Sequence, residues 1–95
     1  MPKIAWSKLA HADLSAIVEY ISEDNPDAAQ SLINDIVGKV EKLPSFPQMG
    51  RTGRVANTRE LVALANYIVV YQCTPELIRI LRILHAARQW PPLDE

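Results

Sequence analysis

Residues 67–85 read YIVVYQCTPELIRILRILH, which is two apolar runs separated by a short polar turn. β-Branched and aromatic residues predominate in both runs, and residues of these types favour strands. We therefore predict strands at Tyr67–Cys73 and Leu77–His85, joined by a hairpin turn at Thr74-Pro75-Glu76.

The second of these strands is unusual because both of its sides are apolar. Strict alternation places one set of side chains on one side, Ile78, Ile80, Arg82 and Leu84, and a second set on the other, Leu77, Arg79, Leu81, Ile83 and His85. Each side combines apolar residues with an Arg, so neither resembles an ordinary solvated surface. We expect another protein to cover the side that this chain leaves open, or alternatively the chain's own loop and tail.

Upstream of this hairpin, the sequence predicts a further strand, a loop and an edge strand. Thr58–Leu64 is a third β-rich run, separated from the next by a turn at Ala65-Asn66. Residues 44–57 contain two Pro and two Gly without a sustained period, which indicates a loop. Lys3–Trp6 is a short apolar-leaning stretch that we interpret as an edge strand.

Two amphipathic helices are predicted between residues 7 and 44. Ser7 is a good N-cap, and the apolar stripe that follows it runs to about Ser22. Asn25-Pro26 marks a second start, because Asn caps well and Pro is tolerated in the first helical position. The short joint between the helices predicts an antiparallel helical hairpin.

The expected order of elements is β-α-α-β-β-β, an α+β fold with the N-terminal helical hairpin packed on one face of an antiparallel sheet. Residues 1–95 are expected to form a single domain. Apolar residues make up 48% of the chain, which is ample for a core and too much for a disordered chain.

The charges are divided between the two halves of the chain. The net charge is −1, yet all four Lys lie in residues 1–50 with seven acids. All six Arg lie in residues 51–95 with four acids: Arg51, Arg54, Arg59, Arg79, Arg82 and Arg88. Arg presents a planar fork that suits phosphates and carboxylates. The Arg residues therefore either keep the sheet soluble or form a surface for an acidic partner, which could be nucleic acid or protein.

Several classes of protein are disfavoured. The apolar runs are far shorter than the roughly 20 residues that cross a bilayer, and the start lacks the apolar stretch of a signal peptide. Cys73 is the single cysteine, which suits a reducing compartment, so we expect a cytoplasmic protein without membrane association. The sequence has no metal-ligand spacing and no phosphate-binding Gly loop, and we expect no metal and no cofactor.

Six short segments, in order over residues 4–92, together carry a resemblance to a known family. They are Trp6 with Ala12-Asp13-Leu14, Ile17 and Tyr20-Ile21; Asn25-Pro26 with Ala28-Ala29; Phe46-Pro47-Gln48-Met49-Gly50-Arg51; Thr58-Arg59-Glu60-Leu61; Asn66-Tyr67-Ile68-Val69-Val70-Tyr71; and the ending from Ile80 to Pro91. In this combination the sequence resembles the RelE/ParE superfamily of type II toxins.

The resemblance implies a toxin that arrests growth, that is neutralised by a cognate ParD-like or RelB-like antitoxin in a hetero-oligomer, and that belongs to a plasmid or chromosomal stabilisation system. It also implies two alternative targets. ParE-like members poison DNA gyrase, whereas RelE-like members cut mRNA on the ribosome. The long helical hairpin resembles the ParE side, so gyrase inhibition is our first hypothesis and the mRNA endonuclease our second. A third is an inactive relative that serves as a binding or autoregulatory module.

We assign binding surfaces on the type and place of the residues. For the antitoxin, an acidic segment that folds on binding, the candidates are the apolar and Arg positions of the last strand, Ile78, Arg79, Ile80, Arg82 and Leu84. For the target, they are Arg51 and Arg54 in the loop and Arg88 and Trp90 in the tail, since Arg and Trp often dominate interfaces.

Whether the chain is an enzyme is left open, and no catalytic residue is favoured. A ribonuclease would need a proton carrier and cationic clamps. The candidates are His85 or Glu60 as the proton carrier and, as clamps, Arg51, Arg54, Arg59, Arg82 and Arg88. The simpler interpretation makes His85 a polar strand end bonded to backbone and Glu60 the partner of an Arg. The absence of strong positive charge also argues against RNA binding.

Overall fold

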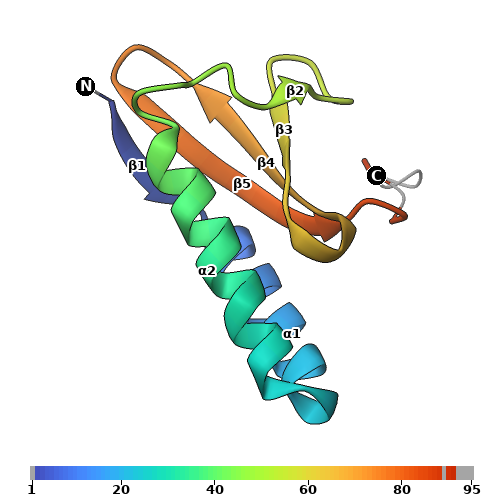
Figure 1. The fold of residues 1–95 in the computed structure, drawn as a ribbon. Coiled ribbons are helices and arrows are strands. Elements are labelled where there is room, and N and C mark those ends of the chain that lie inside the picture. The colour runs from blue at the N-terminus through green and yellow to red at the C-terminus, as the bar shows by residue number, and fades with distance from the viewer. Residues whose placement is uncertain (1, 89, 92–95) are drawn as a thin grey trace.

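The computed structural model describes residues 2–88 and 90–91, which form two helices packed on one face of a five-stranded mixed sheet. In chain order the elements are β1 (Lys3–Trp6), α1 (Lys8–Asp24), α2 (Pro26–Lys42), β2 (Arg51–Thr52), β3 (Arg59–Val62), a 3₁₀ turn at Leu64–Asn66, β4 (Tyr67–Cys73) and β5 (Leu77–His85). The strands lie in the order β1-β5-β4-β3-β2 (Figure 1). The predicted α+β class and the helical hairpin on one sheet face are confirmed.

The helices begin at the predicted N-caps. The Ser7 hydroxyl accepts a hydrogen bond from the Ala10 N–H at 2.9 Å and donates one to the Leu81 carbonyl at 2.8 Å, so it also fixes α1 to β5. Asn25 serves both helices: its N–H donates to the Ile21 carbonyl, and its side chain accepts from the Ala28 N–H. Helix α1 therefore extends two residues beyond the predicted Ser22. The end of the hairpin near Asn25 projects beyond the sheet (Figure 1).

The sheet differs from the purely antiparallel sheet that was predicted. β1 is an edge strand, as expected, but it pairs in parallel with β5, while the other pairs are antiparallel. The loop after α2 contributes the two-residue strand β2, which pairs with Arg59 and Glu60 of β3. β3 is shorter than the predicted Thr58–Leu64, because Leu64–Asn66 form the 3₁₀ turn, with positive φ at Ala65 and Asn66.

The predicted alternation along β5 is wrong, because the strand contains a bulge. Val70 of β4 pairs with Arg82 and Tyr71 pairs with Ile80, so Leu81 is an extra residue. Ile78, Ile80 and Ile83 consequently all lie in the core under the helices, whereas Arg82 and Leu84 lie on the opposite face. A strict period of two cannot anticipate such an insertion.

The main core lies between the helices and the sheet. Helix α2 contributes one stripe of buried side chains, including Leu32, Ile36 and Val40. Helix α1 contributes Ala10. The strands contribute Leu61, Val69, Tyr71, Ile78, Ile80 and Ile83. A second, smaller cluster of Ile68, Val70 and Leu84 lies on the other face of the sheet, with Leu81, Ala86 and Trp90 packed against it. Ala86 and Trp90 thus cover part of that face, which agrees with the alternative prediction that the chain's own tail covers it.

Within the part of the chain that the structure describes, neither helix has the length and apolar character needed to cross a membrane.

Candidate functional site

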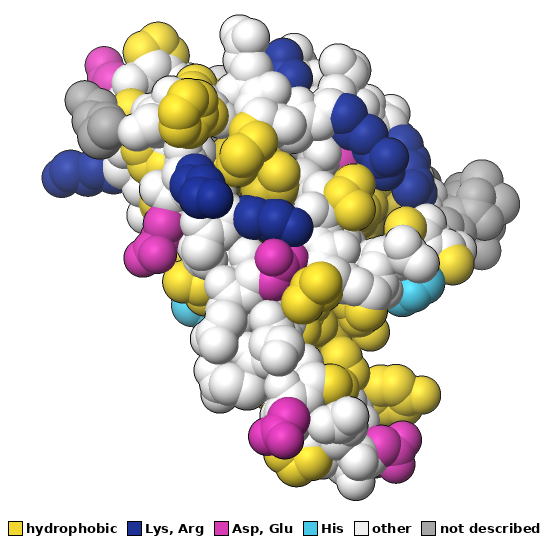
Figure 2. All heavy atoms as spheres, in the orientation of Figure 1, with side chains coloured by type: hydrophobic (Ala, Val, Ile, Leu, Met, Phe, Trp, Pro, Cys, Tyr) yellow, Lys and Arg dark blue, Asp and Glu magenta, His cyan; other side chains and the backbone are white. Residues whose placement is uncertain are grey.

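The sheet face opposite the helices carries most of the candidate residues, and we call it the open face. It is formed by Arg51 of β2, Glu60 of β3, Ile68 and Val70 of β4, and Arg79, Arg82 and Leu84 of β5. Figure 2 shows one group of Lys and Arg side chains on the side of the molecule that carries β2 and others elsewhere on the sheet end, whereas the tip of the helical hairpin carries Asp and Glu side chains. The tip of the hairpin is therefore acidic, and the side that carries β2 has a group of basic side chains.

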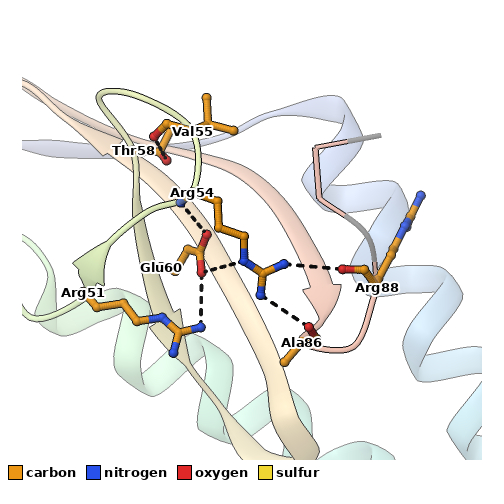
Figure 3. A network of polar contacts seen from close by, with 7 residues as sticks. All are labelled: Arg51, Arg54, Val55, Thr58, Glu60, Ala86 and Arg88. Carbon is orange, nitrogen blue, oxygen red and sulfur yellow. Dashed lines mark hydrogen bonds and ion pairs between the residues drawn. The ribbon is translucent and has the colours of Figure 1, made fainter. Parts of the chain in front are cut away.

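Glu60 is the centre of a polar network on this face (Figure 3). Its side chain is only 1% exposed, and its Oε1 lies 3.2 Å from Arg51 Nη2 and 3.7 Å from Arg54 Nε. Its Oε2 accepts a hydrogen bond from the Arg54 backbone N–H at 3.0 Å. A buried carboxylate is costly unless it is paired and hydrogen-bonded, and here both conditions are met. Two Arg around one Glu leave the network with a net positive charge.

Arg54 links this network to the C-terminal residues. Its Nη2 donates to the Ala86 carbonyl at 3.3 Å and its Nη1 donates to the Arg88 carbonyl at 3.4 Å. The loop that holds Arg54 is closed by Thr58, whose hydroxyl donates to the Val55 carbonyl at 2.6 Å. The side chain of Arg88 points away from the network (Figure 3). The structure therefore brings Arg51, Arg54 and Arg88, all predicted to bind the target, to one region.

Arg82 is held by Asp13 of α1. Its Nε and Nη2 donate to the two carboxylate oxygens of Asp13 at 2.7 and 3.0 Å, and the Ile83 N–H donates to Asp13 Oδ2 at 3.0 Å. The hydrogen bond with Asp13 raises the pKa of Arg82 above its usual value. The Arg82 guanidinium carbon lies 5.6 Å from the centroid of the Trp90 ring, within the range of a cation–π contact.

Asp13 is the site residue that the sequence did not reveal. It is separated from Arg82 by 69 positions, and its place on α1 gave no sign of a partner on the last strand. Together with Ser7 it satisfies the edge of β5 beyond the end of β1, where the Leu81 carbonyl and the Ile83 N–H would otherwise lack strand partners.

His85 lies on the helix side of the sheet, not on the open face. It is the register partner of Tyr67, and the two rings meet edge to face at a centroid distance of 5.2 Å. Its Nδ1 accepts a hydrogen bond from the Ala87 N–H at 3.1 Å, the backbone contact of the simpler interpretation. A hollow of about 610 Å³ beside it is lined by Ile21, Leu32 and Tyr67, among others.

Arg59 also lies away from Glu60, at the opposite end of β4 from His85. It pairs with Tyr71 in the sheet, and its Nη1 donates to the Gly50 carbonyl at 2.7 Å. The candidate ribonuclease residues are therefore divided between the two faces of the sheet. Glu60 lies with Arg51 and Arg54, Arg82 is paired with Asp13, and His85 and Arg59 lie at opposite ends of the helix side.

The candidate antitoxin-binding residues are divided as well. Arg79, Arg82 and Leu84 lie on the open face, but Ile78 and Ile80 are completely buried beneath the helices. The bulge at Leu81 causes this correction: Ile78 and Ile80 contribute to the core instead of to a surface. Among the described residues, no group of three or more His, Cys, Asp or Glu is placed to hold a metal ion.

Solved structures place this architecture among small bacterial toxins of the RelE/ParE superfamily. A chain of the chromosomal ParDE toxin-antitoxin system of P. aeruginosa superposes with a TM-score of 0.78 at 28% identity, covering 90% of this chain and 96% of that one. A chain of the E. coli DinJ-YafQ complex superposes with a TM-score of 0.61 at 16% identity, covering 95% and 99%. The second likeness concerns the fold alone.

Sequence comparison gives the family. Residues 4–90 match the family described as the ParE toxin of the type II toxin-antitoxin system parDE, and the chain belongs to this family. Y4kP of Sinorhizobium fredii is 40% identical over 90 residues, covering 94% of this chain and 93% of that protein. Toxin RelE2 of Caulobacter vibrioides is 38% identical over 88 residues, covering 93% and 99%. The resemblance found in the sequence is confirmed.

Proposed function

We propose that this toxin inhibits DNA gyrase and is kept inactive in the cytoplasm by a ParD-like antitoxin. The observation that carries the choice of target is the separation of His85 from Glu60 and its Arg partners on opposite faces of the sheet. RNA cleavage needs a proton carrier and cationic groups around one phosphate. Gyrase inhibition needs only a surface that grips the enzyme or its DNA complex. This agrees with a group of Arg residues whose one neighbouring carboxylate, Glu60, is buried and paired with Arg51 and Arg54.

The surface proposed to grip the target consists of Arg51, Arg54, Arg88 and Trp90. Arg51 is 55% exposed and Arg54 is 37% exposed, although both also contact Glu60. Exposed Arg side chains that are partly fixed lose little conformational entropy on binding, which favours affinity. The higher identity and TM-score of the ParDE chain, compared with the DinJ-YafQ chain, support a ParE-like rather than a YafQ-like toxin.

An antitoxin partner is supported by the similar solved structures, because ParDE and DinJ-YafQ are toxin-antitoxin complexes or systems. We place the antitoxin on the open face, where Arg79, Arg82 and Leu84 remain from the residues predicted from the sequence. An amphipathic acidic segment that folds on binding would match apolar positions flanked by Arg.

The experiment that tests this function is expression of the chain without its antitoxin in a bacterial host. The proposal predicts a DNA-damage response and filamentation within minutes while protein synthesis continues. His85→Ala should arrest growth as the wild type does, because His85 is remote from the proposed surface. Arg88→Glu should relieve the arrest at equal levels of folded protein.

Two results would replace the proposal. Immediate loss of translation with cleaved mRNA, abolished by His85→Ala, would establish the ribosome-dependent nuclease, the alternative that the name of the relative RelE2 suggests. Soluble, folded protein without any effect on growth would indicate the third hypothesis, a relative that acts only by binding.

A further inference from the structure

We propose that Trp90 occupies, in the free toxin, the position that an apolar side chain of the antitoxin takes in the complex, so that the antitoxin displaces Trp90 from the open face as it binds. The inference rests on the proposed function in taking the partner to be an antitoxin. It follows from the contacts of Trp90, from the charges around it and from an indole N–H that is poorly satisfied where it lies.

The surface beneath Trp90 is a small apolar site that needs a cover. Ile68, Val70 and Leu84 are at most 1% exposed, although they lie on the face that the helices do not reach. Trp90 is among the three partly buried residues packed against them. Removing it without replacement would return apolar area to water, so the open position must be occupied by something.

Trp90 fills this position imperfectly. Its Nε1 is buried, yet it has no hydrogen-bond partner among the residues that the structure describes. A buried indole N–H is ordinarily hydrogen-bonded, and leaving it unsatisfied opposes burial of the ring. A Leu, Ile or Phe of a partner would cover the same cluster without this cost. Replacement of Trp90 by such a side chain is therefore favourable.

The charges around the site select an acidic partner. Although Arg54 Nε lies 3.7 Å from Glu60 Oε1, its Nη1 and Nη2 donate to neutral carbonyl groups, those of Arg88 and Ala86, at 3.4 and 3.3 Å. Hydrogen bonds from Arg to carboxylates are stronger than bonds to neutral acceptors. A partner segment with carboxylates beside its apolar anchor would replace two long bonds with charge-assisted ones and would also meet the exposed Arg88.

Arg82, which lies beside Trp90, should keep its position when Trp90 is displaced. Arg82 is anchored by Asp13 through two short hydrogen bonds, and both side chains are largely buried, at 17% and 13% exposed. Its guanidinium would therefore stay where an incoming aromatic ring could stack on it. The site is preformed beneath a cover that can be exchanged.

The exchange would also explain neutralisation. Trp90 and Arg88 belong to the surface proposed to grip the target, and Arg54 holds the segment that carries them. An antitoxin that takes over both the apolar cluster and Arg54 removes these residues from their place on the sheet. Antitoxin and target would then compete through the position of one segment.

The first test measures antitoxin affinity, because the sign of the effect decides the question. If Trp90 must be displaced, Trp90→Ala removes the competitor, and the antitoxin should bind about tenfold more tightly when the covered state predominates. If Trp90 instead contacts the antitoxin, the same change should weaken binding. Phe46→Ala removes an exposed aromatic side chain that is not part of the cluster beneath Trp90, and it should leave the affinity unchanged. Unchanged or weaker binding by a folded Trp90→Ala variant would overturn the proposal.

A second test needs no antitoxin and so separates this inference from the proposed function. The probe is anilinonaphthalene sulfonate, an anionic aromatic dye that should bind the uncovered site. Trp90→Ala should increase its fluorescence severalfold while the far-ultraviolet circular dichroism spectrum stays unchanged, and Trp90→Phe should not increase it. Adding Arg54→Gln to Trp90→Ala should reduce the dye signal, whereas adding Lys8→Gln should not. A dye signal that does not rise in Trp90→Ala would disprove the apolar site, whether or not the chain inhibits gyrase.

Discussion

The hydroxyl of Tyr71 connects the core to the loop that leads into the candidate surface. Tyr71 is fully buried, and its hydroxyl accepts a hydrogen bond from the Gly50 N–H and donates one to the Pro47 carbonyl, both at 2.9 Å. Burial raises the pKa of Tyr71, so the hydroxyl remains a donor at neutral pH. Gly50 has to be Gly here, because a Cβ would collide with the Tyr71 ring and hydroxyl. One side chain thus sets the path of the chain just before Arg51.

Replacing Tyr71 with Phe should therefore lower the free energy of unfolding by about 1–3 kcal/mol, because a buried N–H and carbonyl lose their partner. Denaturant titration followed by circular dichroism measures the loss. Tyr20→Phe is the matched control, since Tyr20 is 73% exposed and should change stability little. Equal effects of the two substitutions would show that the Tyr71 hydroxyl does not hold the loop.

The joint between the helices depends on a single cap. The Asn25 side chain accepts the Ala28 N–H at 3.0 Å, and Pro26 follows in the first helical position. Asn25→Ala should lower the free energy of unfolding by about 1 kcal/mol, the usual contribution of an N-cap. Asn34→Ala, in the middle of α2 and exposed, is the control and should cost less, since Ala suits a helix interior. A larger loss at Asn34 than at Asn25 would contradict the cap.

The helices and the long strands could be predicted because local patterns determine them. Ser7 and Asn25-Pro26 marked the helix starts, and the apolar runs gave β4 and β5 their observed bounds. The parallel placement of β1 and the bulge at Leu81 could not, because both depend on how distant segments pair. The bulge is why Ile78 and Ile80 were wrongly placed on a binding surface.

In the candidate site, too, the sequence predicted some contacts and missed those between distant segments. Glu60 was expected to pair with an Arg, and the register of β2 against β3 places Arg51 opposite it. The pair of Asp13 and Arg82 could not be expected, since it joins the first helix to the last strand. The hydrogen bonds from Arg54 to the backbone beyond β5 could not be predicted either, because the alternation of residues along one strand does not show contacts with distant segments.

The two faces of the sheet are covered to different extents, one well, by the helices, and the other only in part. The helical hairpin buries the main core, and α1 also closes the edge of β5 through Ser7 and Asp13. The open face has Trp90 and the Arg54 network as its cover. We propose that the toxin uses this face both for the antitoxin and for the target, with Trp90 as a cover that the antitoxin displaces.

The central claim, that the basic surface acts on gyrase, is tested most directly with purified components. Gyrase, plasmid DNA and ATP are incubated with increasing amounts of the toxin, and cleaved DNA is measured on a gel after denaturation of the enzyme. We predict that linear DNA accumulates with toxin concentration, that His85→Ala behaves as the wild type, and that the antitoxin abolishes the effect. Unchanged supercoiling with no cleaved DNA at any toxin concentration, from a preparation that arrests growth in cells, would contradict the account.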